Sequence, residues 1–121
     1  MKSILFIFLG GGLGSTFRYL IGRFIITNNE SYPWHTLIAN YVGCLIIGLL
    51  LGWAMKNDTL RSDLYLFSAV GFCGGLTTFS TLSSESLHFL KAGHYWAFIS
   101  YLFLSITGGI ILVALGHFVS K

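Results

Sequence analysis

Long apolar stretches alternate with short polar ones along the chain, and four of the apolar stretches are long enough to cross a membrane. Each exceeds the ~20 residues that an α-helix needs to span ~30 Å of hydrocarbon. The pattern predicts transmembrane helices over residues 3–26, 34–55, 63–90 and 95–118. Because the connections between them are short, we expect residues 1–121 to form a single all-α integral membrane domain.

Composition agrees with the hydropathy pattern. Of the 121 residues, 55% are hydrophobic and only 9% are charged, whereas a soluble domain devotes about a quarter of its residues to charge. The net charge of +3 comes from scattered basic residues, and no basic run alternates with aromatic residues as on a nucleic-acid-binding surface. We therefore expect a lipid bilayer around the chain and no nucleic acid among its partners.

Four spans place both termini on one side of the membrane, so the basic residues on each side can be counted. The terminal side carries Lys2, Lys56, Arg61 and Lys121, and the opposite side carries Arg23 and Lys91. Basic residues favour the cytoplasmic side, but this bias is weak. Two topologies stay open: insertion in both orientations, which would allow an antiparallel homodimer, or termini that face the cytoplasm in every copy.

The third span contains the unusual stretch GFCGGLTTFSTLSS at residues 71–84. Its two adjacent glycines loosen a helix, and its six hydroxyl side chains are polar where lipid is the solvent. Backbone that is not helical at membrane depth is tolerated where protein or a water-filled cavity satisfies its peptide groups. The stretch predicts a third helix broken near its middle, with freed carbonyls for a cation and a helix N-terminus for an anion. Each hydroxyl could instead bond back to its own helix.

Polar residues on the other spans also indicate a polar path inside the protein. Asn40 could donate to a passing anion or merely bridge two helices. Tyr101 and Ser105 are four residues apart and lie on one face of the fourth helix. Arg18 could turn inward as a positive vestibule or extend to the lipid headgroups. Together these residues predict a pathway for an anion.

Glycines recur at four-residue spacing in two spans. Gly10 and Gly14 form such a pair in the first span, and Gly48 and Gly52 form another in the second. This spacing places both glycines of a pair on one face, where the backbone of another helix can come close. We expect helix packing at both pairs.

Three segments together resemble the Fluc, or CrcB-type, fluoride ion channel family. They are GGGLGSTFRY in the first span, NYVG at residues 40–43 and, most specifically, GFCGGLTTFSTLS in the third span. The resemblance covers all four spans. It implies a dual-topology homodimer in the bacterial inner membrane, which exports fluoride passively through two antiparallel pores at the dimer interface.

The resemblance also implies roles for individual residues. Gly74 and Thr77 would offer backbone carbonyls to a structural sodium ion on the two-fold axis. Asn40 would be the pore asparagine, and Phe79 would be the first of two pore phenylalanines. The rest of the fluoride pathway would comprise Ser80, Thr81, Leu82, Ser83, Tyr101, Ser105 and Arg18.

One position departs from the usual pattern of the family. Where the motif usually runs TTFSTFS, this chain reads TTFSTLS, with Leu82 at the place of the second aromatic residue. Leucine lacks the positive ring edge that attracts an anion. We expect an intact dimer in which the anion site of the second phenylalanine is weakened or absent.

Two other classes of membrane protein stay open. A proton-coupled antiporter like the small multidrug transporters needs an acid deep in the membrane, and only Glu85 could serve. A non-conducting packing subunit would use the hydroxyl cluster and Asn40 as contacts between helices. An enzyme is not expected, because no nucleophile, base and orienting residue occur at plausible spacing.

Overall fold

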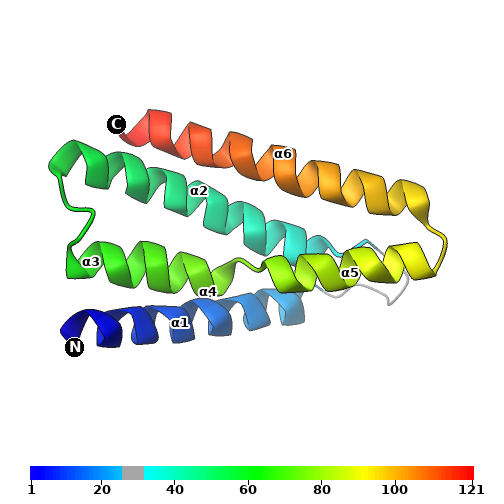
Figure 1. The fold of residues 1–121 in the computed structure, drawn as a ribbon, viewed down its shortest axis with the longest axis horizontal. Coiled ribbons are helices and arrows are strands. Elements are labelled where there is room, and N and C mark those ends of the chain that lie inside the picture. The colour runs from blue at the N-terminus through cyan, green and yellow to red at the C-terminus, as the bar shows by residue number, and fades with distance from the viewer. Residues whose placement is uncertain (26–31) are drawn as a thin grey trace.

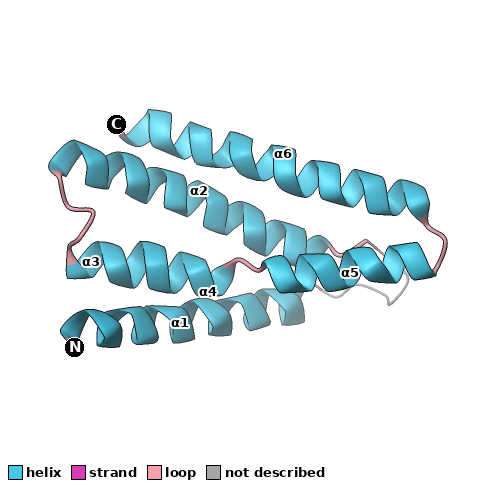
Figure 2. Cartoon of the chain, viewed as in Figure 1, coloured by secondary structure: helices cyan, strands magenta, loops and turns pink. Residues whose placement is uncertain are grey.

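The computed structural model describes residues 1–25 and 32–121, which form a bundle of long helices (Figure 1). Three of them are α1 (Lys2–Phe24), α2 (Trp34–Asn57) and α6 (Tyr95–Ser120), and the third apolar stretch comprises α3 (Asp63–Tyr65), η1 (Leu66–Cys73), α4 (Gly74–Leu76) and α5 (Phe79–Lys91). Within the described ranges there is no strand (Figure 2). Four helical stretches are long and apolar enough to cross a membrane, which confirms the predicted all-helical architecture.

The predicted spans agree with these helices to within a few residues. The second and fourth continue slightly beyond their predicted ends, to Asn57 and Ser120. Residue 26, the predicted end of the first span, and the following residues 27–31 lie outside the described part of the chain. The N- and C-termini lie at the same end of the bundle (Figure 1), as an even number of antiparallel spans requires.

α1 packs directly against η1 and α4 because its glycines leave room for their backbones. A Cβ atom added to Gly10 would lie 2.1 Å from the carbonyl oxygen of Phe67, and one added to Gly14 would lie 2.1 Å from that of Phe72. Neither approach is possible for a residue with a side chain. The packing role predicted for this pair is confirmed. Gly12 is different, since a Cβ there would meet nothing within 4 Å.

The second glycine pair brings α2 against α6. A Cβ added to Gly48 would lie 2.3 Å from the carbonyl oxygen of Val113, and Gly52 faces the last turn of α6 near His117. Gly116 on α6 allows the same close approach from the other side, because a Cβ added to it would lie 2.6 Å from the carbonyl oxygen of Leu45. The close approach predicted from the spacing is confirmed here too.

The third apolar stretch is not helical throughout. Helical backbone ends at Leu76 and begins again at Phe79, while Thr77 (φ −91°, ψ 156°) and Thr78 (φ −152°, ψ 125°) are extended. The preceding η1 is wound as a π-helix, a form that is rare in proteins and often lies at functional sites. Adjacent glycines and β-branched threonines have low helix propensity. The peptide groups at this interruption therefore need partners from elsewhere in the fold.

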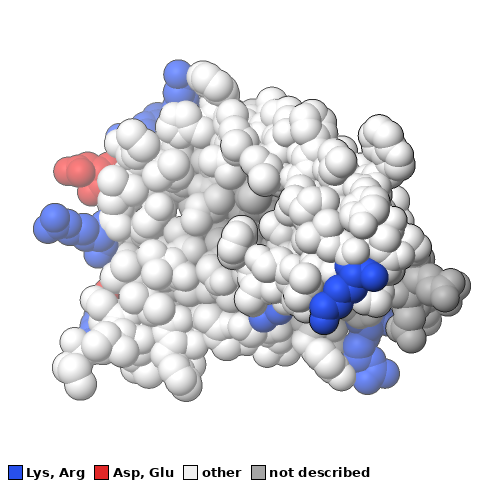
Figure 3. Space-filling view, turned by 45° about the vertical axis from the view of Figure 1, so that its right-hand side comes forward, with Lys and Arg blue, Asp and Glu red and all other residues white. Residues whose placement is uncertain are grey.

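The face of the bundle in Figure 3 separates charged from uncharged surface. On the face in Figure 3, most lysine, arginine and acidic side chains lie toward the ends, and a broad band between them carries none. The buried hydrophobic cluster lies near one end and consists of Leu37, Leu82, Phe89 and Tyr101. An uncharged band between two charged ends is the surface expected of a helical bundle that crosses a bilayer.

Candidate functional site

α2 supplies the partner for the interrupted backbone. The side-chain oxygen Oδ1 of Asn40 accepts a hydrogen bond from the N–H of Thr78 at 2.8 Å, and Nδ2 donates to the carbonyl oxygen of Thr78 at 3.4 Å. The amide thus replaces the helical partners that Thr78 lacks. An amide NH2 group has two donors, so one N–H is left for another acceptor. Asn40 bridges two helices and also keeps a donor.

The hydroxyl of Thr78 caps α5. Its Oγ1 accepts from the N–H of Thr81 at 3.2 Å, and it is also hydrogen-bonded to Ser80 Oγ at 3.1 Å and to Thr81 Oγ1 at 3.3 Å. Such a cap satisfies one of the free N–H groups in the first turn of a helix. Thr77 differs, because its hydroxyl bonds back to the carbonyl of Cys73 at 2.9 Å. The sequence did not single out Thr78 among the six hydroxyl residues, although threonine is one of the favoured N-cap residues.

A hollow of about 530 Å³ opens beside the interruption, between α2, η1, α5 and α6. We call it the central hollow. Its polar lining comes from Asn40, Thr77, Thr78 and Ser105, and the rest of it is mostly apolar. The hydroxyl oxygen of Ser105 is buried and has no hydrogen-bond partner among the described residues. The hollow therefore offers neutral donors in an apolar setting.

The two residues of the aromatic motif differ in exposure. Phe79 lines the central hollow and is 79% exposed, so within one chain its ring is hardly packed. Leu82 also reaches the hollow, but it is only 7% exposed and belongs to the buried cluster with Phe89 and Tyr101. A side chain at position 82 thus serves the core as well as the hollow.

The fourth-helix pair is divided between two environments. Ser105 lines the central hollow, whereas Tyr101 is 0% exposed and is not part of its lining. The hydroxyl of Tyr101 donates to Oε1 of Glu85 at 3.0 Å. The structure therefore brings Ser105, but not Tyr101, to Asn40. The role of Tyr101 in an anion pathway stays a prediction.

A second hollow, of about 470 Å³, lies where α1, α2 and α5 meet, and we call it the basic hollow. Arg18 lines it and turns toward the protein, because its Nε donates to the carbonyl oxygen of Gly75 at 3.1 Å. Arg23, His35 and Thr81 also line it. Of the two orientations open for Arg18, the structure has the inward one. Ser80 and Ser83 are exposed on α5 and line neither hollow.

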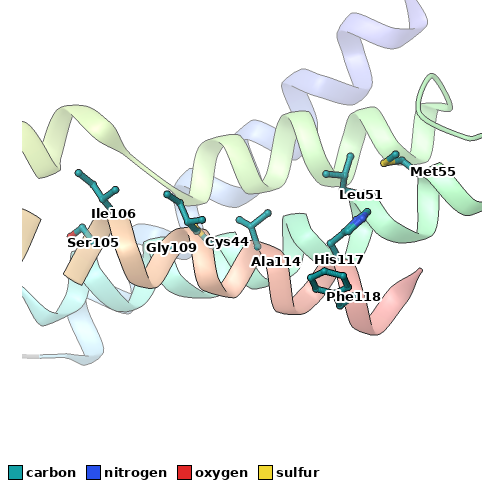
Figure 4. Close-up of a pocket in the computed structure, with 11 residues that line it drawn as sticks. Cys44, Leu51, Met55, Ser105, Ile106, Gly109, Ala114, His117 and Phe118 are labelled. Carbon is teal, nitrogen blue, oxygen red and sulfur yellow. The ribbon is translucent and has the colours of Figure 1, made fainter. Parts of the chain in front are cut away.

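A third hollow, of about 710 Å³, runs along α2 and α6 (Figure 4). Cys44, Ser105 and Ile106 line both this hollow and the central one. Figure 4 places Ser105 and Ile106 at one end and His117 with Phe118 at the other. The central hollow thus continues as an apolar surface toward the end of the bundle where the termini lie.

Comparisons with known proteins agree with one another over the whole chain. The family model described as CrcB-like protein, Camphor Resistance (CrcB), matches residues 5–117. A protein named fluoride-specific ion channel FluC, from Phocaeicola vulgatus, is 43% identical over 122 residues, which cover 100% of both chains. Proteins of the same name are 42% identical in Bacteroides fragilis, over 100% of this chain and 98% of the relative, and 45% identical in Desulfotalea psychrophila, over 99% and 93%.

Proposed function

We propose that this chain, which belongs to the CrcB-like protein family, is a fluoride-specific ion channel of the bacterial plasma membrane. The observation that carries the proposal is the full-length similarity to proteins of that name. The central hollow supports it, because Asn40 and Ser105 present neutral donors there. A small anion that gives up its water needs donors at several moderate sites, since a single strong site would hold it. Conduction is passive and involves no chemical step.

We propose further that two copies of the chain form an antiparallel homodimer with two pores. Phe79 is almost unpacked within one chain, and a Cβ added to Gly74 would meet nothing within 4 Å. The apolar hollow of Figure 4 adjoins these residues through Ser105 and Ile106. A second copy would cover this surface and place Phe79 beside the anion path. The weak charge bias between the two sides permits both orientations.

We also propose a structural sodium ion at the interruption. In a continuous helix the N–H of Thr78 would bond to the carbonyl of Gly74, but here it bonds to Asn40. Thr77 is extended, and both Gly74 and Thr77 line the central hollow. Their carbonyls are therefore available, and hard cations prefer oxygen ligands. We propose that two carbonyls from each copy hold the ion, which supplies positive potential without a titratable group.

The test is anion efflux from liposomes that contain only this purified protein. Ion-selective electrodes would follow fluoride and chloride, with protein-free liposomes as the control. We expect fast fluoride loss, negligible chloride loss and no need for a proton gradient. A dimeric protein without fluoride flux would contradict the proposal and favour a packing subunit. Flux that requires a proton gradient and disappears in Glu85→Gln would favour an antiporter.

A further inference from the structure

His35 and Glu85 form a contact to which the proposed function gives no role. Nε2 of His35, near the start of α2, lies 3.8 Å from Oε2 of Glu85 on α5, and their side chains are 34% and 22% exposed. The other carboxylate oxygen of Glu85 accepts the hydrogen bond from Tyr101 on α6. One carboxylate thus joins three helices, and one of its two oxygens faces an imidazole.

The histidine of this contact lines the basic hollow, and Glu85, which is not part of that lining, lies 3.8 Å from its Nε2. His35 lines that hollow together with Arg18, Arg23, Thr78 and Thr81. Thr78 also lines the central hollow, so the two hollows meet at the interruption. An anion that enters the basic hollow therefore approaches the donors of the central one. The charge of the groups around this entrance affects how readily an anion passes.

The ring of His35 lies close to α1. A Cβ added to Gly22 of that helix would lie 3.7 Å from the Cδ2 atom of His35. Its Nδ1 is buried and has no hydrogen-bond partner in the described part of the chain. The titratable and charged groups around it come from three elements: Arg18, Tyr19 and Arg23 of α1, Glu85 of α5 and Tyr101 of α6. Glu85 is the one carboxylate in this set.

We propose that His35 is a further residue of the anion pathway, which when protonated neutralises Glu85 and opens the basic hollow to small anions. This inference rests on the proposed function. With a neutral imidazole, the carboxylate of Glu85 repels an approaching anion. With an imidazolium, the contact becomes an ion pair. Arg18 and Arg23 then make the electrostatic potential in the basic hollow positive. Flux is therefore larger at a pH low enough to protonate the imidazole.

The experiment measures fluoride efflux at about pH 6 and about pH 8, two values at which an ordinary histidine is protonated to very different extents. The pH is equal inside and outside, because channels of both orientations are then exposed to it. Protein-free liposomes give the leak of hydrogen fluoride, which is subtracted. We expect the wild-type flux to be roughly threefold to tenfold larger at the lower pH, the effect of one added charge several ångströms from the ion.

Two variants identify the residues responsible. His35→Gln should remove the pH dependence and give the low flux at both pH values. Glu85→Gln should raise the flux at the higher pH toward the value at the lower pH, because the repelling charge is gone. The matched control is His88→Gln, which changes an exposed histidine on α5 away from the basic hollow and should keep the wild-type ratio.

The outcomes separate the inference from the function beneath it. The role of His35 would be overturned by equal wild-type fluxes at the two pH values, or by a full pH dependence in a dimeric His35→Gln variant. Neither result would contradict the proposal that the protein is a fluoride channel. A Glu85→Gln variant without any gain at the higher pH would overturn it as well, even if His35→Gln does not fold. Absence of wild-type fluoride flux at both pH values would overturn the channel itself.

Discussion

The carboxamide of Asn40 forms with the peptide groups of Thr78 the pair of hydrogen bonds that the interrupted helix does not provide. Thr78 in turn lines both the central and the basic hollow. Asn40 lines the central hollow as well. The side chain that pairs with the interrupted backbone thus also faces the proposed anion path. A substitution at Asn40 will act on structure and on conduction together, and the predictions below separate the two effects.

Asn40→Asp should reduce fluoride flux by at least about tenfold, because a carboxylate close to the path repels the anion. The new side chain still accepts from the N–H of Thr78 but no longer donates to its carbonyl oxygen, so the protein should remain a folded dimer of lower stability. Efflux from liposomes and size-exclusion chromatography would measure both properties. Asn57→Asp is the control, since Asn57 lies exposed at the end of α2. Unchanged flux in Asn40→Asp would argue against a donor role for the amide.

Leu82→Phe should raise fluoride flux and lower stability at the same time. The flux rises because a second ring edge reaches the central hollow. Stability falls, by about 1–3 kcal/mol, because the larger ring must fit into a position that is only 7% exposed. Efflux rates and thermal unfolding in detergent would be compared with the wild type. Equal efflux rates from a folded variant would show that the missing ring does not limit conduction.

Gly14→Ala should destabilise the protein, whereas Gly12→Ala should not. A methyl group at position 14 would collide with the Phe72 carbonyl and push α1 from η1, a form of overpacking that costs about 1–3 kcal/mol. At position 12 a methyl group meets nothing, and alanine favours a helix over glycine by about 1 kcal/mol. Thermal unfolding of the two variants side by side measures the difference. Similar melting temperatures would contradict the packing of α1 described above.

Gly74→Ala tests the proposed dimer axis and its sodium ion. Within one chain the added methyl group meets nothing, so folding of the single chain should be preserved. At a two-fold axis the same methyl group would face its copy beside the cation, and the dimer should weaken by about tenfold or more, as overpacking of about 1–3 kcal/mol implies. The dimer fraction would be measured with sodium and with a bulky organic cation in its place. The control is Gly12→Ala.

For that experiment, the wild-type dimer should lose stability when sodium is replaced, because the carbonyls of Gly74 and Thr77 would then face one another without a cation. A wild-type dimer that is indifferent to the cation would remove the sodium ion from the proposal. A Gly74→Ala variant that dimerises as well as Gly12→Ala would place the axis elsewhere.

Features that extend over whole helices could be predicted from the sequence. The four apolar stretches and the glycine pairs are regular patterns, and burial in lipid and close packing act along the full length of a helix. The contact of Gly14 with Phe72 follows from such a pattern. The role proposed for Phe79 came from the resemblance, and no contact within the single chain decides it.

Partners between helices could not be read from the sequence in the same way. Asn40 and Thr78 are 38 positions apart, and either could have bonded within its own helix. The inward turn of Arg18 depends on the carbonyl of Gly75, which is within reach only because of how α1 packs. Tyr101 and Ser105 share a helix face, yet the hydroxyl of Tyr101 donates to Glu85, while that of Ser105 has no partner among the residues that the structure describes. Such choices depend on the tertiary arrangement.

The pairing of Asn40 with Thr78 also bears on how the chain enters the membrane. Peptide groups without partners are strongly disfavoured in hydrocarbon, so the interrupted segment needs α2 beside it as it leaves the aqueous phase. α2 precedes that segment in the chain, and synthesis runs from the N-terminus. Asn40 is therefore synthesised before Thr78, so the side chain that pairs with the interrupted backbone is present in the chain before that backbone is made.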